Sequence, residues 1–470
     1  MIGDCNKEFI YKIIDNKIDE INLNTLSYWQ ITTIYNALKI NTSIKKVNLE
    51  SVSYVDECLD KEIALIIKSL KNNTCLERLY IGYNDKIDIT TLTYLENNTC
   101  LKELILQDNF IEDISPLKFL KNNSCLKVLD LSINEIEDIN PLKFLSNSCL
   151  EILNLSNNNI EDISALKFLL NSCLRELYLN CNQIKDISPL KFLSNSCLEK
   201  LYLSNNKIED ITPLKFLTNS CLQKLDLSNN KIEDLTPLKF LSNSCLEYLN
   251  LSNNKIKYLT PLKFLSNFCL QKLDLSKNQI EDLTPLKFLS NFCLQKLDLS
   301  NNKIEDLTPL KFLSNSCLQK LYLSGNQIED LTPLKNLSNS CLKKLKLSSN
   351  KIKDITPLKF LLNSYLEYLN LSRNQIEDLT VLKFLSNSCL KYLDLSENQI
   401  KDISPLKFLE NSCLEVLGLS DNQIKDITSL YFLLNNSCLE YLELNHNQLS
   451  NQDKQKIIEL ANLKQIKLHI

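Results

Sequence analysis

Hydrophobic and polar residues recur along this chain with a period of 24 or 25 residues. Most periods have leucines at the first, fourth and sixth places and polar residues at the third and fifth, as at Leu222, Leu225 and Leu227 around Lys224 and Asp226. This alternation predicts a short strand with one buried face. One strand per period predicts a parallel sheet whose exposed face carries the third and fifth places.

An asparagine occupies the ninth place of the period sixteen times, from Asn84 to Asn447. Its side-chain amide is both donor and acceptor, so it can satisfy backbone groups of its own and the neighbouring coil. We therefore expect a stacked asparagine ladder. Beyond it, Thr236-Pro237 precedes a short apolar segment, and all eleven prolines of the chain fall in that one column. We expect Thr236 to be an N-cap and Pro237 to open about two turns of α- or 3₁₀-helix.

This repeating phrase resembles that of the leucine-rich repeat family, and the resemblance covers nearly the whole chain. It implies an α/β solenoid, a horseshoe with a parallel concave sheet and short helical or 3₁₀ turns on the convex side. The 24-residue coils, with their Asp-Ile-Ser-Pro-Leu phrase, are similar to internalins and to phosphatase-regulating repeat proteins. Two earlier coils, spaced by 26 and 32 residues, resemble ribonuclease-inhibitor-type repeats.

The ends of the array differ from its middle. Strand-like positions continue back through Ile44 and Val47 to Ile18 and Ile21, and the intervening segments 26–40 and 58–70 are long enough for helices. At the other end, Ser450-Asn-Gln-Asp453 predicts a capped helix start. We expect nineteen coils in one continuous domain, divided into an N-terminal cap region (1–73), an array of regular repeats (74–449) and a C-terminal cap (450–470).

Fifteen of the eighteen cysteines occupy a single column, from Cys75 to Cys438. Parallel stacking would leave column neighbours too far apart at Cβ for unstrained disulfides. Neither a Cys-x-x-Cys motif nor a paired Cys/His motif is present, so no metal site is expected. The column is expected to consist of buried, reduced, small apolar side chains, and so many free thiols favour a reducing cytosol.

Charge and motifs narrow the class of function. A net charge of −4 gives no basic footprint for nucleic acid, and no apolar run approaches 18 residues, so no membrane partner is expected. No secretion signal is recognised at the start. Catalytic motifs are absent, and recurrent pairs such as Glu209-Asp210 are best explained as a solvated rim facing the lysine column Lys118 to Lys407. We expect a protein that is not an enzyme and needs no cofactor.

Surface recognition remains, and the exposed strand positions are its predicted site. From Lys224 to Lys320, lysine beside aspartate predicts cross-strand charge pairing. Tyrosine is enriched at binding hot spots and also suits strands. The predicted partner-binding residues are Tyr178, Tyr202, Lys224, Tyr248, Lys272, Lys296, Lys320, Tyr322, Lys344, Tyr368, Tyr392 and Tyr441.

Three functions are consistent with these features. The first is a cytoplasmic, monomeric scaffold or adaptor that binds a protein on the concave face, in the host cytosol if the chain is a secreted effector. The second is a regulatory subunit of a protein phosphatase, which the resemblance implies. The third is a structural array without a specific ligand.

Overall fold

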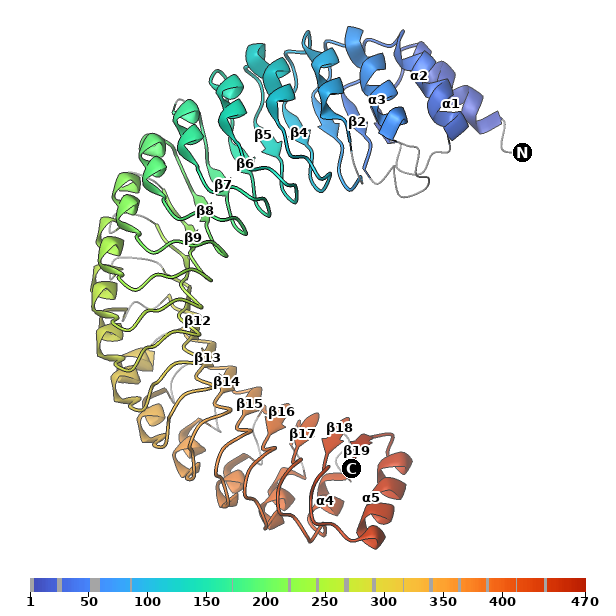
Figure 1. Ribbon diagram of the computed structural model, residues 1–470. Helices are drawn as coiled ribbons and strands as arrows, with labels where there is room; N and C mark the ends of the chain where they lie inside the picture. Colours follow the sequence, from blue (N-terminus) through green and yellow to red (C-terminus); the bar gives the residue numbers. More distant parts are fainter. Residues whose placement is uncertain are drawn as a thin grey trace. The chain divides into compact units, whose positions relative to one another are not determined.

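The structure is a computed structural model that describes residues 4–22, 28–50, 60–84, 87–170, 172–218, 221–241, 245–265, 270–289, 293–315, 317–337, 341–361, 365–385, 389–410, 412–434 and 438–470. The chain forms two compact units. Unit 1 comprises Met1–Lys231 and Asn243–Leu246, and unit 2 comprises Ile232–Ser242 and Glu247–Ile470. In each unit the strands line the concave side and the helical turns the convex side (Figure 1).

Unit 1 contains nine strands within the described ranges, and consecutive strands pair in parallel with a register of one coil, as at Leu201↔Leu225. Every strand has three residues because the chain turns away on either side of the alternating segment. The strands are β1 (Glu20–Asn22), β2 (Lys46–Asn48), β3 (Arg78–Tyr80), β4 (Glu103–Ile105), β5 (Val128–Asp130), β6 (Ile152–Asn154), β7 (Glu176–Tyr178), β8 (Lys200–Tyr202) and β9 (Lys224–Asp226).

Unit 2 contains ten strands in its described part, again parallel and paired in chain order, as at Leu297↔Leu321. They are β10 (Tyr248–Asn250), β11 (Lys272–Asp274), β12 (Lys296–Asp298), β13 (Lys320–Tyr322), β14 (Lys344–Lys346), β15 (Tyr368–Asn370), β16 (Tyr392–Asp394), β17 (Val416–Gly418), β18 (Tyr441–Glu443) and β19 (Lys467–His469). The nineteen strands described in the two units equal the predicted number of coils.

The connections are short 3₁₀ helices in the regular coils and α-helices towards the ends. The α-helices are α1 (Asp4–Ile14), α2 (Tyr28–Leu38), α3 (Asp60–Ser69), α4 (Leu430–Leu434) and α5 (Asn451–Leu463). The predicted helices in 26–40 and 58–70 are thus confirmed as α2 and α3, whereas α1 was not predicted. Ser450 caps α5 as expected, because its hydroxyl accepts the Asp453 N–H at 3.1 Å.

Most of the 3₁₀ helices begin one residue before the proline column, and η2 (Leu70–Asn72) begins after the equivalent place. They are η2 (Leu70–Asn72), η3 (Ile89–Leu95), η4 (Ser115–Asn122), η5 (Asn140–Leu145), η6 (Ser164–Leu169), η7 (Ser188–Leu193), η8 (Thr212–Leu217), η9 (Thr236–Leu241), η10 (Thr260–Leu265), η11 (Thr284–Leu289), η12 (Thr308–Asn315), η13 (Thr332–Leu337), η14 (Thr356–Phe360), η15 (Thr380–Leu385) and η16 (Ser404–Leu409).

The core of each unit lies between its sheet and its helical turns, and asparagines close one edge of it. Leucines of the strand columns, such as Leu201, are fully buried. The Asn206 amide nitrogen donates to Leu179 O of the preceding coil at 2.9 Å and to Leu203 O at 3.1 Å, while its oxygen accepts the Ile184 N–H at 3.0 Å. The same bonds recur along the column, so the predicted asparagine ladder is confirmed.

The residue before most ladder asparagines lies in the left-handed region, which lets the chain turn sharply out of the strand. Asn205 has φ of 54°, and Asn tolerates this region better than most residues. Ile133 adopts the same φ of 54°, which is unfavourable for a β-branched side chain. Gly325, with φ of 69°, meets the same requirement without a side chain.

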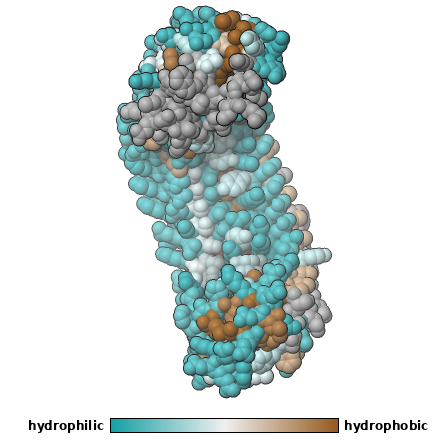
Figure 2. All heavy atoms as spheres, turned by 90° about the vertical axis from the view of Figure 1, so that its right-hand side faces the viewer, coloured by the Kyte–Doolittle hydropathy of each residue, from teal (hydrophilic) through white to brown (hydrophobic). Residues whose placement is uncertain are grey.

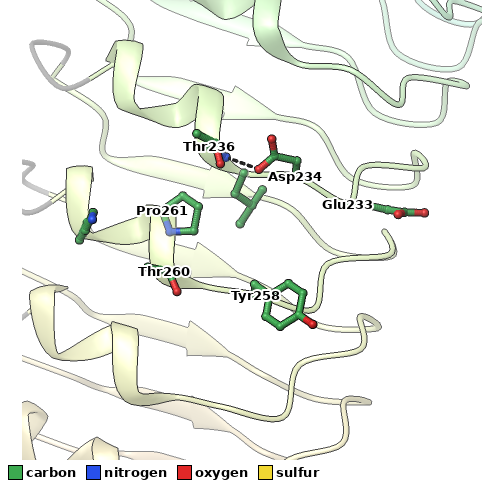
Figure 3. A pocket seen from close by; sticks show the side chains of 8 residues that line it. Glu233, Asp234, Thr236, Tyr258, Thr260 and Pro261 are labelled. Carbon is green, nitrogen blue, oxygen red and sulfur yellow. Dashed lines mark hydrogen bonds between the residues drawn. The ribbon is translucent and has the colours of Figure 1, made fainter.

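One prediction about the convex flank is wrong. Thr236 is not an N-cap but the first residue of η9, and its N–H donates to the Asp234 carboxylate at 2.8 Å (Figure 3). The aspartate of each Glu-Asp pair therefore caps the helix that follows it. This role was not predicted from its position, four residues after the ladder asparagine. The acidic rim itself is solvated, as predicted: Glu233 and Asp234 are exposed, and Glu233 pairs with Lys255 at 3.3 Å.

The cysteine column is not buried, contrary to prediction. Fourteen of its members lie in the described part of the chain, where all are free thiols, thirteen of them exposed and Cys438 partly exposed. Each described cysteine of the column lies at a turn, three residues before a strand, as Cys197 does before β8. The next residue, a leucine such as Leu198, is buried in the core, and the cysteine is not. Cys181, outside the column, is also free. Cys5, Cys58 and Cys269 lie outside the described side chains.

Candidate functional site

The exposed face of the sheet brings the predicted binding residues into columns. From β3 to β16 each three-residue strand buries its middle leucine and leaves its first and third side chains wholly or partly accessible, as in β9, β11 and β13. Because neighbouring strands pair in register, residues at one place of successive coils lie side by side. All twelve predicted residues lie on this face: three in unit 1, on β7, β8 and β9, and nine in unit 2, from β10 to β18. Hydrophilic side chains predominate on the side of the molecule seen in Figure 2.

In unit 1 two of the predicted tyrosines form a rigid pair. The Tyr178 and Tyr202 rings stack with centroids 4.8 Å apart and planes 7° apart. Glu176 accepts the Tyr178 hydroxyl at 2.5 Å and the Lys200 amine at 2.6 Å. Burial and this carboxylate raise the pKa of Tyr178, so the phenol stays protonated and keeps donating. Lys224 lies beside Lys200 on the adjacent strand.

In unit 2 four predicted lysines lie in register on neighbouring strands, from β11 to β14: Lys272, Lys296, Lys320 and Lys344. Like charges side by side on a sheet destabilise it. Lys296 is compensated by Asp274 at 3.5 Å and Asp298 at 3.4 Å, so the predicted charge pairing is confirmed there. Among the described residues, the other three amines form no ion pair.

The electrostatics of Lys296 differ from those of its neighbours. Burial alone would lower the pKa of its amine, but Asp274 and Asp298 more than offset this effect and raise it. Lys296 is therefore held charged and fixed in position, and its charge is already neutralised. The amines of Lys272, Lys320 and Lys344 are the ones still available to an incoming anion.

A pocket opens on this face beside the lysines. Its volume is about 260 Å³, and it is lined by Tyr248, by Lys272, Lys296 and Lys320, and by the side-chain amides of Gln295 and Gln319, with Leu273 and Asp274. Four of the predicted site residues thus converge on one pocket. The two glutamines were not predicted, because they precede the strand and belong to neither exposed column.

Aromatic rings continue the lysine row towards β16. The centroid of the Tyr322 ring lies 5.3 Å from the Lys296 amine and 4.8 Å from the Lys346 amine. Both distances are in the range of cation–π contacts. Tyr368 stacks on Tyr392 with centroids 4.1 Å apart. We call Lys272, Lys296, Lys320, Tyr322, Lys344, Lys346 and Tyr368 the lysine–tyrosine cluster. Lys346 was not among the predicted site residues. It could have been found from the sequence, because it is a lysine at the fifth place of its coil, where most other coils have Asp, Asn or Tyr.

Tyr441 does not join this cluster. Between β16 and β18, the first and third places of β17 hold the partly accessible Val416 and the buried Gly418. The Tyr441 hydroxyl donates to Glu443 at 2.5 Å, and its ring lies 5.3 Å from that of His469. Tyr441 therefore belongs to a separate patch at the last strands of unit 2.

The chemistry of this face is that of binding. It presents cations, amides and phenols to an anionic or aromatic ligand. In the described part of the chain no group of three or more His, Cys, Asp or Glu side chains could hold a metal ion.

The His446 side chain is exposed, and its Nδ1 lies 2.9 Å from a carboxylate oxygen of Asp421. None of the helices whose residues are described is both long and apolar enough to cross a bilayer.

Comparisons with known proteins agree with this geometry. The leucine rich repeat family matches residues 99–170, 172–232, 220–280, 269–328 and 364–424, and a second family, of two-copy leucine rich repeats, matches 150–192 and 342–384. Together these ranges cover more than half of the chain. No curated protein matches the sequence.

Several solved structures are similar. A leucine-rich repeat protein of Leptospira interrogans is 24% identical, with a TM-score of 0.66, over 93% of this chain and 98% of that one. An internalin (inlF) of Listeria monocytogenes is 30% identical, with a TM-score of 0.49, over 80% and 87% of the two chains. The plant peptide hormone receptor RGFR1, in complex with RGF2, is 19% identical, with a TM-score of 0.60, over 98% and 88%.

Proposed function

The chain belongs to the leucine-rich repeat family, and we propose on that basis that it is a non-enzymatic scaffold which binds a protein partner through the exposed face of its sheet. The fold is commonly used for protein–protein interaction. The lysine–tyrosine cluster of unit 2 is the centre of the proposed site. Its partner is an acidic segment or surface, whose carboxylates would pair with the lysine row.

The lysine row is the observation that carries this proposal. Lys320 and Lys344 lie side by side on adjacent strands and repel each other, and Lys272 lies in the same row on the other side of Lys296. None of these three amines receives a compensating carboxylate from the described residues. These like charges form no ion pair within the described part of the fold, whereas an anionic ligand would relieve the repulsion on binding. Tyr322 and Tyr368 add large contact areas that are already held by neighbouring cations and so lose little conformational freedom on binding.

The rigidity of the platform also supports a binding role. The asparagine ladder fixes the end of each strand to the coil before it, so the spacing of the columns is set before a partner arrives. A preorganised surface avoids part of the entropic cost of association.

Affinity capture from a native extract tests the proposal. The baits are the wild type, Lys320→Glu/Lys344→Glu, and Lys311→Glu/Lys335→Glu as a control of equal charge change on the exposed helix lysines. A fourth bait, Tyr322→Ser/Tyr368→Ser, removes the rings and keeps the charge.

We expect the wild type and the helix-lysine control to retain the same protein, and the two cluster variants to lose it by about tenfold or more, which is the scale of a hot-spot loss. Binding should also weaken as salt is raised. Equal recovery of every protein by all four baits would exclude this site and favour a structural array. Capture of a phosphatase would favour the regulatory-subunit alternative.

A further inference from the structure

The aspartates that cap the 3₁₀ helices form a column with a single interruption. In fourteen coils, from Asp88 to Asp426, the carboxylate accepts the N–H two residues later at 2.7 to 2.9 Å. Tyr258 takes this place in one coil of unit 2, where no corresponding bond forms at Thr260 within the described residues. The coil of Tyr258 therefore lacks the carboxylate hydrogen bond that caps the helix in the other fourteen coils.

Tyr258 gains no burial in exchange for the missing cap. Its side chain is 69% exposed, among the most exposed of the large hydrophobic residues described. A ring this exposed, with the Lys257 amine 5.5 Å from its centroid, contributes little to the stability of its own chain. Exposed aromatic side chains of this kind are typical anchors of protein–protein contacts.

The ring stands at a pocket of about 520 Å³ formed by two successive coils (Figure 3). Pro261 and Thr260 come from the coil of Tyr258, and Thr236 with Asp234 from the coil before. The volume is sufficient for a large apolar side chain and its neighbours.

A positive charge without an ion-pair partner among the described residues lies beside this pocket, on Lys257, which precedes Tyr258 and does not itself line the pocket. Its two carboxylates are already engaged, Glu233 with the Lys255 amine at 3.3 Å and Asp234 with the Thr236 N–H at 2.8 Å. The Lys257 amine lies 5.5 Å from the Tyr258 ring centroid, and it forms no ion pair with any described residue. A ligand with a carboxylate would complete the site.

We propose that this flank pocket is a second protein-binding site, independent of the sheet face, which takes a peptide segment with an apolar side chain next to a carboxylate. The apolar side chain packs against the Tyr258 ring and Pro261. The adjacent carboxylate pairs with the Lys257 amine. The site therefore favours segments in which an apolar side chain lies next to a carboxylate.

Selection from a random dodecapeptide phage library on the wild-type chain tests the proposal, with affinities of the selected peptides then measured by fluorescence anisotropy. Two variants probe the site, Tyr258→Asp and Lys257→Glu. Tyr365→Ser is the matched control, because Tyr365 is 67% exposed and lies on the same unit outside this pocket.

We expect enriched peptides to pair an apolar residue with Asp or Glu, and to bind both site variants about tenfold or more weakly while binding the control unchanged. Tyr258→Asp restores the cap of the other coils and should melt no lower than the wild type, so misfolding cannot explain its loss of binding. Failure to enrich any peptide, enrichment of basic peptides, or equal affinity for Tyr258→Asp would overturn the proposal.

Discussion

The asparagine ladder allows a quantitative test of how the coils hold together, and Asn302 is the position we would change. Its amide nitrogen lies 3.0 Å from Leu275 O of the preceding coil and 3.0 Å from Leu299 O, and its oxygen accepts the Ile280 N–H at 3.0 Å. Asn302 is 8% exposed, so water cannot readily replace these partners.

The cost of Asn302→Ala follows from these contacts. Two donated hydrogen bonds are lost at about 1 kcal/mol each, and the buried Ile280 N–H is left without an acceptor at about 1 to 3 kcal/mol. The carbonyl oxygens of Leu275 and Leu299 each keep a second asparagine donor, from Asn278 and Asn326, so they add little. We therefore expect a loss of about 3 to 5 kcal/mol in the free energy of unfolding.

Urea unfolding and hydrogen exchange together measure this loss. Gln279→Ala is the control, because it removes an exposed amide from the preceding coil and should stay within about 0.5 kcal/mol of the wild type. The Ile280 amide should lose most of its protection from exchange in Asn302→Ala only. A loss below about 1 kcal/mol with Ile280 still protected would show that the ladder does not join the coils.

Three further predictions concern single columns. Ile133→Asn should stabilise unit 1 by about 0.5 to 1 kcal/mol in thermal unfolding, because Asn tolerates the left-handed φ of 54° and Ile133 is 40% exposed; an unchanged or lower stability would contradict the strain argument. Most of the column thiols should react with a maleimide in the native protein without denaturant, since they are exposed and free, and full protection would restore the buried assignment. The hydrogen bonds to Ser188 and Thr428 lower the pKa values of Asp186 and Asp426, so their stabilising contribution is complete above the unfolded pKa near 3.9 and is lost as the pH falls through the lower folded values; acid unfolding of Asp426→Asn should show a weaker pH dependence than that of the wild type.

The strands and the ladder could be predicted from sequence because they repeat a local pattern. Leu222, Leu225 and Leu227 alternate with polar residues at the period of a strand, and the period of the whole phrase predicts that strands stack. The candidate face followed directly, since a parallel register places the third and fifth residues of every coil on one side. Its division into a tyrosine pair, a lysine row and a separate Tyr441 patch did not follow, because it depends on side-chain distances.

By itself the sequence determined the columns: which residues recur, at what spacing, and hence the repeat fold with its exposed sheet face. Outside the strands, where side chains do not alternate, only the tertiary structure decided which columns are buried, which are exposed and which cap a helix. Cys245 and its equivalents lie at a turn, where the direction of a side chain is set by contacts and not by alternation, and they prove to be exposed. Asp234 caps a helix because the backbone brings the Thr236 N–H to its carboxylate. For the same reason Tyr258 could be recognised as an exposed aromatic without a cap only once that backbone was in place.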